Sequence, residues 1–191
     1  MGGNESAAVR YRIDAGQSRF VVQAFADGLL SVLGHNPTAA ICGFGGDARF
    51  VPDTLQQASL LMLVSADSLA VVGDMSEKDR REMERMMRED VLEIARYPEI
   101  VFMCTKVTAH PKTKGRYRTG IVGDLSLHGV TREHLINAEV TVDGDGLRAQ
   151  GEFSLRQSEH DIKRVSVAGG ALKIKDELKF SFDIVAHAQV V

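Results

Sequence analysis

Long runs of period-two alternation constrain the fold of this chain more than any other feature of its sequence. Apolar and polar residues alternate through 178–184, and residues 117–127 present a second long apolar face. This pattern is typical of β-strands with one covered and one solvated face, because successive side chains point to opposite sides of a strand. It predicts a sheet of about eight or nine strands. The further strands are expected at 19–24, 39–51, 59–66, 100–107, 135–142 and 147–155.

Short polar turns separate the predicted strands. Segment 142–146 contains Asp-Gly pairs, which tolerate positive φ, and segment 111–115 is a polar loop that ends in glycine. Turns of this kind join antiparallel strands. Strands that are neighbours in the sequence are therefore expected to be neighbours in the sheet.

One segment, at about 76–96, departs from the alternation and predicts an amphipathic α-helix. Its methionines and other apolar residues recur at helical spacing. Ser76 is placed to cap the first turn, with Asp79 at the reciprocal capping-box position. The Tyr97-Pro98 pair is expected to end the helix, because a residue before proline is disfavoured in the helical region.

The predicted elements favour an all-β fold in a single domain. Many antiparallel strands with one helix are compatible with two main architectures, a closed barrel or a two-layer sandwich. Small residues on the apolar face, such as Ala24, Gly123 and Gly151, favour a closed sheet. A barrel of about eight strands has room for one small ligand. Residues 1–10 are expected to form a flexible N-terminus and residues 11–188 the barrel domain.

Composition excludes several classes of partner. The chain has 23 Lys and Arg against 26 Asp and Glu, and its basic residues do not cluster, which argues against a nucleic-acid partner. No apolar run approaches the length of a membrane span, and the first residues lack the apolar core of a secretory signal. A cytoplasmic protein without stable membrane insertion is expected. Cys42 and Cys104 are far apart in the sequence and are expected to be small buried apolar residues.

The glycine-rich segment 43–48 matches the spacing of a dinucleotide-binding fingerprint. That motif binds a pyrophosphate only where it joins a strand to the N-terminus of a helix. Here the following residues are Arg-Phe-Val-Pro-Asp, which cannot begin a useful helix. The glycines are instead expected to let a strand bend sharply or to let another backbone approach closely.

The six histidines leave a metal-dependent or histidine-dependent enzyme as an alternative. No two of them have the His-x-His or His-x-x-x-His spacing that brings two rings to one metal. A metal site would require His35, His134 and His160 to converge through the fold, with Glu133 or Asp161 as a further ligand. The expectation is therefore no metal, no cofactor and no catalytic residue.

Several blocks of the sequence resemble, in order, those of the YceI-like, polyisoprenoid-binding lipid-carrier family. They are YRIDAGQSRFVVQAF, GHNPTAAICGFGGDARFVPDTLQQASLLMLVSADSL, DVLEIARYPEIVF, GDLSLHGVTREHLINAEV and LKIKDELKFSFDIVA. The resemblance implies an eight-stranded antiparallel, lipocalin-like barrel with an elongated apolar cavity for an isoprenoid chain, often in a homodimer. His160 stands where the family commonly has a small or aromatic residue, so a different polar mouth and headgroup preference are expected.

Together these features predict a non-enzymatic protein that binds or carries a long apolar ligand, a polyisoprenoid or quinone-like lipid, inside the barrel. A dimeric interaction module with a filled core is a second alternative. His35 and Asn36 are candidates for contacts with the ligand headgroup. The expected lining consists of inward-facing apolar residues and two adaptable methionines: Phe20, Val22, Phe44, Met83, Met87, Phe102, Leu125, Leu127, Phe153, Leu155, Phe180 and Phe182.

Overall fold

The computed structural model describes residues 7–27, 36–52, 54–167 and 172–189. Most of them lie in strands, as the alternation predicts. The strands are β1 (Val9–Asp27), β2 (Thr38–Ile41), β3 (Phe44–Val51), β4 (Gln56–Ser65), β5 (Leu69–Val72), β6 (Glu99–Thr113), β7 (Arg116–Leu127), β8 (Val130–Asp143), β9 (Gly146–Arg156), β10 (Ser166–Val167) and β11 (Leu172–Ala188). The helical elements are α1 (Glu77–Met86), continued by one π-helical turn (Met87–Val91), and the short 3-10 helices η1 (Ala66–Ser68) and η3 (Gln157–His160).

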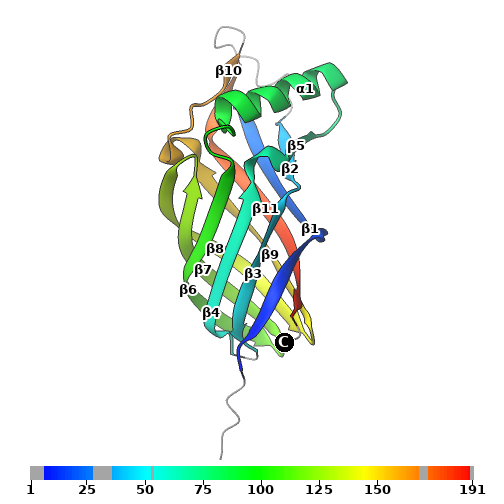
Figure 1. The fold of residues 1–191 in the computed structure, drawn as a ribbon, viewed down its shortest axis with the longest axis vertical. Coiled ribbons are helices and arrows are strands. Elements are labelled where there is room, and N and C mark those ends of the chain that lie inside the picture. The colour runs from blue at the N-terminus through cyan, green and yellow to red at the C-terminus, as the bar shows by residue number, and fades with distance from the viewer. Residues whose placement is uncertain (1–6, 28–35, 53, 168–171, 190–191) are drawn as a thin grey trace, which may run out of the picture.

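Eight of the strands form a closed antiparallel barrel, which confirms the predicted fold class. The strands follow the order β1, β3, β4, β6, β7, β8, β9 and β11, and pairing of β11 with β1 closes the ring. The short strands β2 and β5 extend the sheet beside β1, and β10 pairs with the start of β11. Figure 1 shows α1 lying across one end of the barrel, which is called the helix end here. The opposite end, with the β8–β9 turn, is called the hairpin end.

Apolar side chains fill the barrel wall in two groups. At the hairpin end, the ring of Tyr11 stacks on Phe50 with the ring centroids 4.9 Å apart, and Tyr117 and Leu147 belong to the same buried cluster. Nearer the helix end, a second cluster joins residues of β6, β7 and β9 to Leu92, which follows the helix. No helix in the described part of the chain is long and apolar enough to cross a bilayer.

The helix begins as predicted and ends earlier than predicted. Ser76 Oγ accepts a hydrogen bond from the backbone N–H of Asp79 at 3.1 Å, which confirms the N-cap. The helical conformation stops at Val91. Glu93 then adopts a positive φ of 45°, and its carbonyl accepts the N–H of Tyr97 at 2.9 Å. The chain therefore leaves the helix through a tight turn before it reaches the proline.

Segment 39–51, which was predicted as one strand, forms two strands, because the extended conformation is interrupted at Cys42 and Gly43. The N–H of Cys42 donates to the carbonyl of Ser68 at 3.2 Å, and the carbonyl of Gly43 accepts from Ser65 at 2.8 Å. These bonds to the β4–β5 connection replace regular strand pairing at the bend. The expected burial of Cys42 is wrong, since this residue is exposed, whereas Cys104 is half-buried.

Candidate ligand-binding cavity

The barrel encloses an apolar cavity of about 440 Å³. Its wall begins at the helix end with Met83 and Met87 and reaches Phe50 and Leu147 of the hairpin-end cluster. All eight barrel strands contribute to it, and apolar atoms make up nearly all of its surface. The volume lies within the range of about 300–1,000 Å³ that is typical of sites for small organic ligands.

Aromatic residues on neighbouring strands form one side of this wall. Phe153 of β9 and Phe180 of β11 are register partners, and their rings stack with centroids 4.8 Å apart. Phe182, two positions further along β11, meets the ring of Phe20 from β1 edge to face. Period-two alternation places these rings inside the barrel, while Lys179 and Asp183 of the same strand make ion pairs on its outer surface.

The structure places nearly every predicted apolar lining residue in this wall. Phe44 is the exception: it packs edge to face against the ring of Phe20, with the centroids 5.9 Å apart, and is not part of the wall. Contact of the predicted residues with a ligand stays a prediction. Those found in the wall are Phe20, Val22, Met83, Met87, Phe102, Leu125, Leu127, Phe153, Leu155, Phe180 and Phe182.

Sequence reasoning missed several lining residues that the same alternation identifies. Ile121 of β7 lies four positions before Leu125 on the same face, and Ile184 follows Phe182 by two positions on β11. It also missed the inward position of His134, which precedes Ile136 by two residues on β8. Ile121 and Ile184 belong to the apolar faces predicted at 117–127 and 178–184, and one step of two before Ile136 identifies His134.

The helix is fixed over the helix end of the barrel by hydrogen bonds to β5. Glu84 accepts the backbone N–H of Val71 at 3.0 Å, and Arg80 donates to the carbonyls of Val71 and Gly73 at 2.6 and 3.0 Å. These side chains satisfy backbone groups at the free edge of β5. They also hold the methionine face of the helix toward the cavity, where Met86 joins the wall.

A pair of histidines lies at the cavity, whose other polar lining residues include Gln157 and Lys173. His134 lines the cavity, and its Nε2 lies 3.2 Å from Nε2 of His160 on η3. His160 is fully buried, and its Nδ1 lies 3.2 Å from the carbonyl oxygen of Val130. Burial lowers the pKa of His134 below its ordinary value of 6.5, and the neighbouring His160 lowers it further, against an opposing effect of Glu159.

A third histidine, His128, contacts the backbone of His160. His128, in the β7–β8 turn, donates from Nδ1 to the carbonyl of His160 at 3.2 Å, since a carbonyl oxygen can only accept. Its Nε2 lies 3.3 Å from a carboxylate oxygen of Glu93, and its ring packs on Tyr97 with the centroids 4.5 Å apart. These contacts hold η3 and its His160 against the start of β8.

Of the three histidines that a metal site would require, two, His134 and His160, lie together. His35 lies outside the described residues, and His134 and His160 meet without Glu133 or Asp161. Within the described ranges no group of three or more His, Cys, Asp or Glu side chains could hold a metal ion.

Asn36, the second candidate for a headgroup contact, has a structural role. Its Oδ1 accepts a hydrogen bond from the backbone N–H of Ala26 at 3.2 Å, which ties the start of the β2 segment to the end of β1. The side chain is exposed and is not part of the cavity wall. Its contact with a headgroup stays a prediction.

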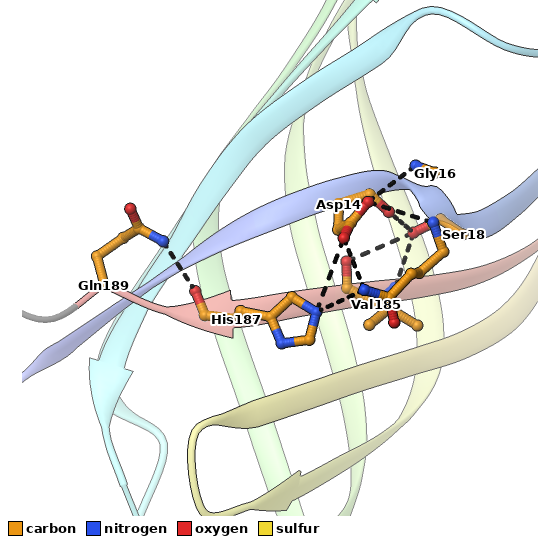
Figure 2. Close-up of polar contacts among 7 residues, drawn as sticks. Asp14, Gly16, Ser18, Val185, His187 and Gln189 are labelled. Carbon is orange, nitrogen blue, oxygen red and sulfur yellow. Dashed lines mark hydrogen bonds and ion pairs between the residues drawn. The ribbon is translucent and has the colours of Figure 1, made fainter.

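A second polar cluster, drawn in Figure 2, stabilises a bulge where β1 and β11 close the barrel. It contains Asp14, Ser18 and His187, the residue types of a hydrolase triad. However, Ser18 Oγ donates to the carbonyl of Asp14 at 2.6 Å and accepts from the N–H of Val185 at 2.9 Å. No hydrogen bond joins Ser18 to His187 in the described structure. The cluster therefore fixes the backbone of the bulge and is not arranged for nucleophilic catalysis.

We expect Asp14 to make this closure sensitive to acid. A hydrogen bond from the side chain of Gln17 lowers the pKa of Asp14 below its ordinary value of 3.8, and N–H groups of Gln17 and Gly16 contribute. The interaction stabilises the fold above pH 3.8 and is lost as the pH falls through the lowered value. Urea unfolding at a series of pH values should show a smaller loss of stability on acidification for Asp14→Asn than for the wild type. An equal loss in both would contradict this role.

A closed antiparallel barrel around one apolar cavity defines a lipocalin-like protein, the class in which a small barrel can enclose one ligand. Comparison with known families makes the assignment specific. The family model of the YceI-like domain matches residues 11–186, and the chain belongs to this family.

Relatives in sequence carry the name UPF0312 protein. One from Pseudomonas savastanoi is 29% identical over 107 residues, which cover 56% of this chain and 50% of the relative. One from Pseudomonas putida strain W619 is 27% identical over 148 residues, covering 76% and 68% of the two chains. The matched part thus spans about half the length of the first of these curated relatives.

Two solved structures share the fold at low sequence identity. BcnA of Burkholderia cenocepacia superposes with a TM-score of 0.67 at 16% identity, covering 91% of this chain and 98% of its own. A polyisoprenoid binding domain from Saccharophagus degradans, implicated in plant cell wall breakdown, gives a TM-score of 0.67 at 14% identity, covering 95% and 99%.

Proposed function

We propose that this protein binds a long apolar ligand, a polyisoprenoid or quinone-like lipid, in the barrel cavity and acts without catalysis. The observation that carries the proposal is the cavity of about 440 Å³ with its almost wholly apolar wall. An apolar chain moved from water into such a space gains about 2.5 kcal/mol for roughly each 100 Å² of surface buried. Tight binding by this mechanism needs few polar contacts and no reactive residue.

The shape of the wall supports an elongated ligand. The cavity extends between the methionines at the helix end and the Tyr11–Phe50 cluster at the hairpin end. Methionine side chains adapt to irregular apolar surfaces, which suits a flexible chain entering beside the helix. The structural neighbour from Saccharophagus degradans is itself described as a polyisoprenoid binding domain, which agrees with this ligand class.

Native mass spectrometry of protein purified without detergent tests the proposal. We expect a mass increase that corresponds to one lipid per chain, and organic extraction should release an isoprenoid or a quinone. The same spectrum reports whether the protein is the homodimer that the resemblance implies. Protein without an adduct that also fails to take up an added long-chain quinone or prenyl alcohol would contradict the proposal.

A further inference from the structure

His134 brings a hydrogen-bonding ring to a cavity wall that is otherwise nearly all apolar. It faces inward near the start of β8, at the end of the barrel where η3 and the helix lie. In an apolar pocket, a few polar groups fix the orientation of the ligand. The protonation state of His134 therefore bears on which ligand end can bind there.

The hydrogen-bond partners of His160 determine which nitrogen of its ring can accept a hydrogen bond. Its Nδ1 lies 3.2 Å from the carbonyl oxygen of Val130, so Nδ1 carries the hydrogen. In the neutral ring, Nε2 is then an acceptor. The ring cannot easily reorient, because His160 is fully buried and its own carbonyl accepts a hydrogen bond from His128.

The acceptor nitrogen of His160 in turn determines which nitrogen of His134 carries the hydrogen. The two Nε2 atoms are 3.2 Å apart, so His134 Nε2 supplies the hydrogen between two neutral rings. His134 Nδ1 is then left as an acceptor. It has no hydrogen-bond partner among the described residues and is not fully buried, and the residue that carries it lines the cavity.

We propose that Nδ1 of His134 accepts a hydrogen bond from the polar end of the ligand, so that the cavity selects an apolar chain ending in a donor such as a hydroxyl. The inference rests on the proposed function and makes its ligand class more specific. An alcohol satisfies the exposed acceptor, whereas an ether or quinone oxygen can only accept and leaves it unpaired. A hydrogen bond of this kind corresponds to a preference of roughly two- to tenfold.

Protonation of His134 removes this acceptor. The ionisable groups around the ring are His160 and Glu159 on η3 and Arg132 on β8, whose Nε donates to the carbonyl of Glu159. Burial and His160 keep the pKa of His134 below 6.5, so the acceptor is present at neutral pH. The preference for an alcohol should disappear as the pH falls through the lowered pKa.

The test compares geranylgeraniol with its methyl ether, two ligands that differ in the terminal donor. Their affinities for the delipidated full-length chain are measured by competition with a fluorescent fatty acid at neutral pH. We expect the wild type to prefer the alcohol roughly two- to tenfold and His134→Leu to bind both equally. His110→Leu, which changes an exposed histidine of β6, is the matched control and should retain the preference.

The outcomes separate this inference from the function on which it rests. Equal binding of the two ligands by the wild type, or an unchanged preference in His134→Leu, overturns the role of His134 and leaves lipid binding intact. Binding of neither ligand overturns the proposed function itself. A pH titration of the wild type needs no variant: the alcohol preference should vanish in acid, because the protonated ring can donate to the oxygen of either ligand, and a constant preference overturns the inference.

Discussion

Leu125→Asp is expected to abolish lipid binding and to lower the free energy of unfolding by about 3–5 kcal/mol. Leu125 lies on β7, is 9% exposed, lines the cavity and packs in the buried cluster nearer the helix end. An aspartate side chain there is too short to reach solvent. Either its charge or an unpaired neutral carboxyl would face the lipid chain, and both are unfavourable in an apolar environment.

Leu135→Asp is the matched control for this substitution. Leu135 is on the neighbouring strand β8, and its side chain is 57% exposed on the outer face. The same chemical change should alter the stability by no more than about 0.5 kcal/mol and leave bound lipid unchanged. Lipid content is measured by native mass spectrometry and stability by urea unfolding.

A third variant guards against misfolding of Leu125→Asp. Ala149→Phe introduces a large apolar side chain into the wall of the cavity and adds no charge. It should reduce the volume available to the lipid at a cost of about 1–3 kcal/mol. Full lipid occupancy in folded Leu125→Asp and in Ala149→Phe would contradict binding within this cavity.

Gly46→Ala is expected to destabilise the barrel by about 3 kcal/mol or more. Gly46 of β3 has a φ of +133°, a conformation that other residues rarely adopt. A Cβ atom at this position would lie 2.0 Å from the backbone oxygen of Leu61 on β4. Relief of that contact requires β3 and β4 to separate, because the obstructing atom belongs to the backbone.

The preceding glycine provides the control. A Cβ atom added at Gly45 would have no neighbouring atom within 4 Å, and Gly45 has no positive φ. Gly45→Ala should therefore change stability by less than about 1 kcal/mol, and the reduced freedom of the unfolded chain favours folding. Urea unfolding followed by circular dichroism measures both variants. Similar midpoints for the two would show that the close approach at Gly46 does not limit stability.

The glycine segment shows how far local sequence reasoning extends. Without a following helix, segment 43–48 could not be a dinucleotide-binding turn, and a bend or a close backbone approach was the remaining explanation. The structure contains both, with the bend at Gly43 and the close approach at Gly46. The sequence could not identify the strand that approaches, since the position of Leu61 depends on the register of β4.

The cavity wall was largely predictable for a similar reason. Inward and outward positions alternate along each strand. Once one residue of a strand is correctly assigned to the inward face, the alternation assigns the others, such as Leu155 with Phe153 and Phe182 with Phe180. Phe44 differs although it lies in register with the lining residue Val64, because its ring packs edge to face against Phe20. Alternation predicts the face on which a residue lies and not how its side chain packs there.

Local sequence patterns were enough to predict the all-β class, the inward faces of the strands and the N-cap of the helix. Each of these depends on residues that are close together in the chain, through the two-residue period of a strand or the first turn of a helix. Local patterns did not predict that η3 brings His160 to His134, or that Glu93 ends the helical segment in a turn beside His128. These arrangements depend on strand register and barrel closure, which arise from contacts between residues far apart in the sequence.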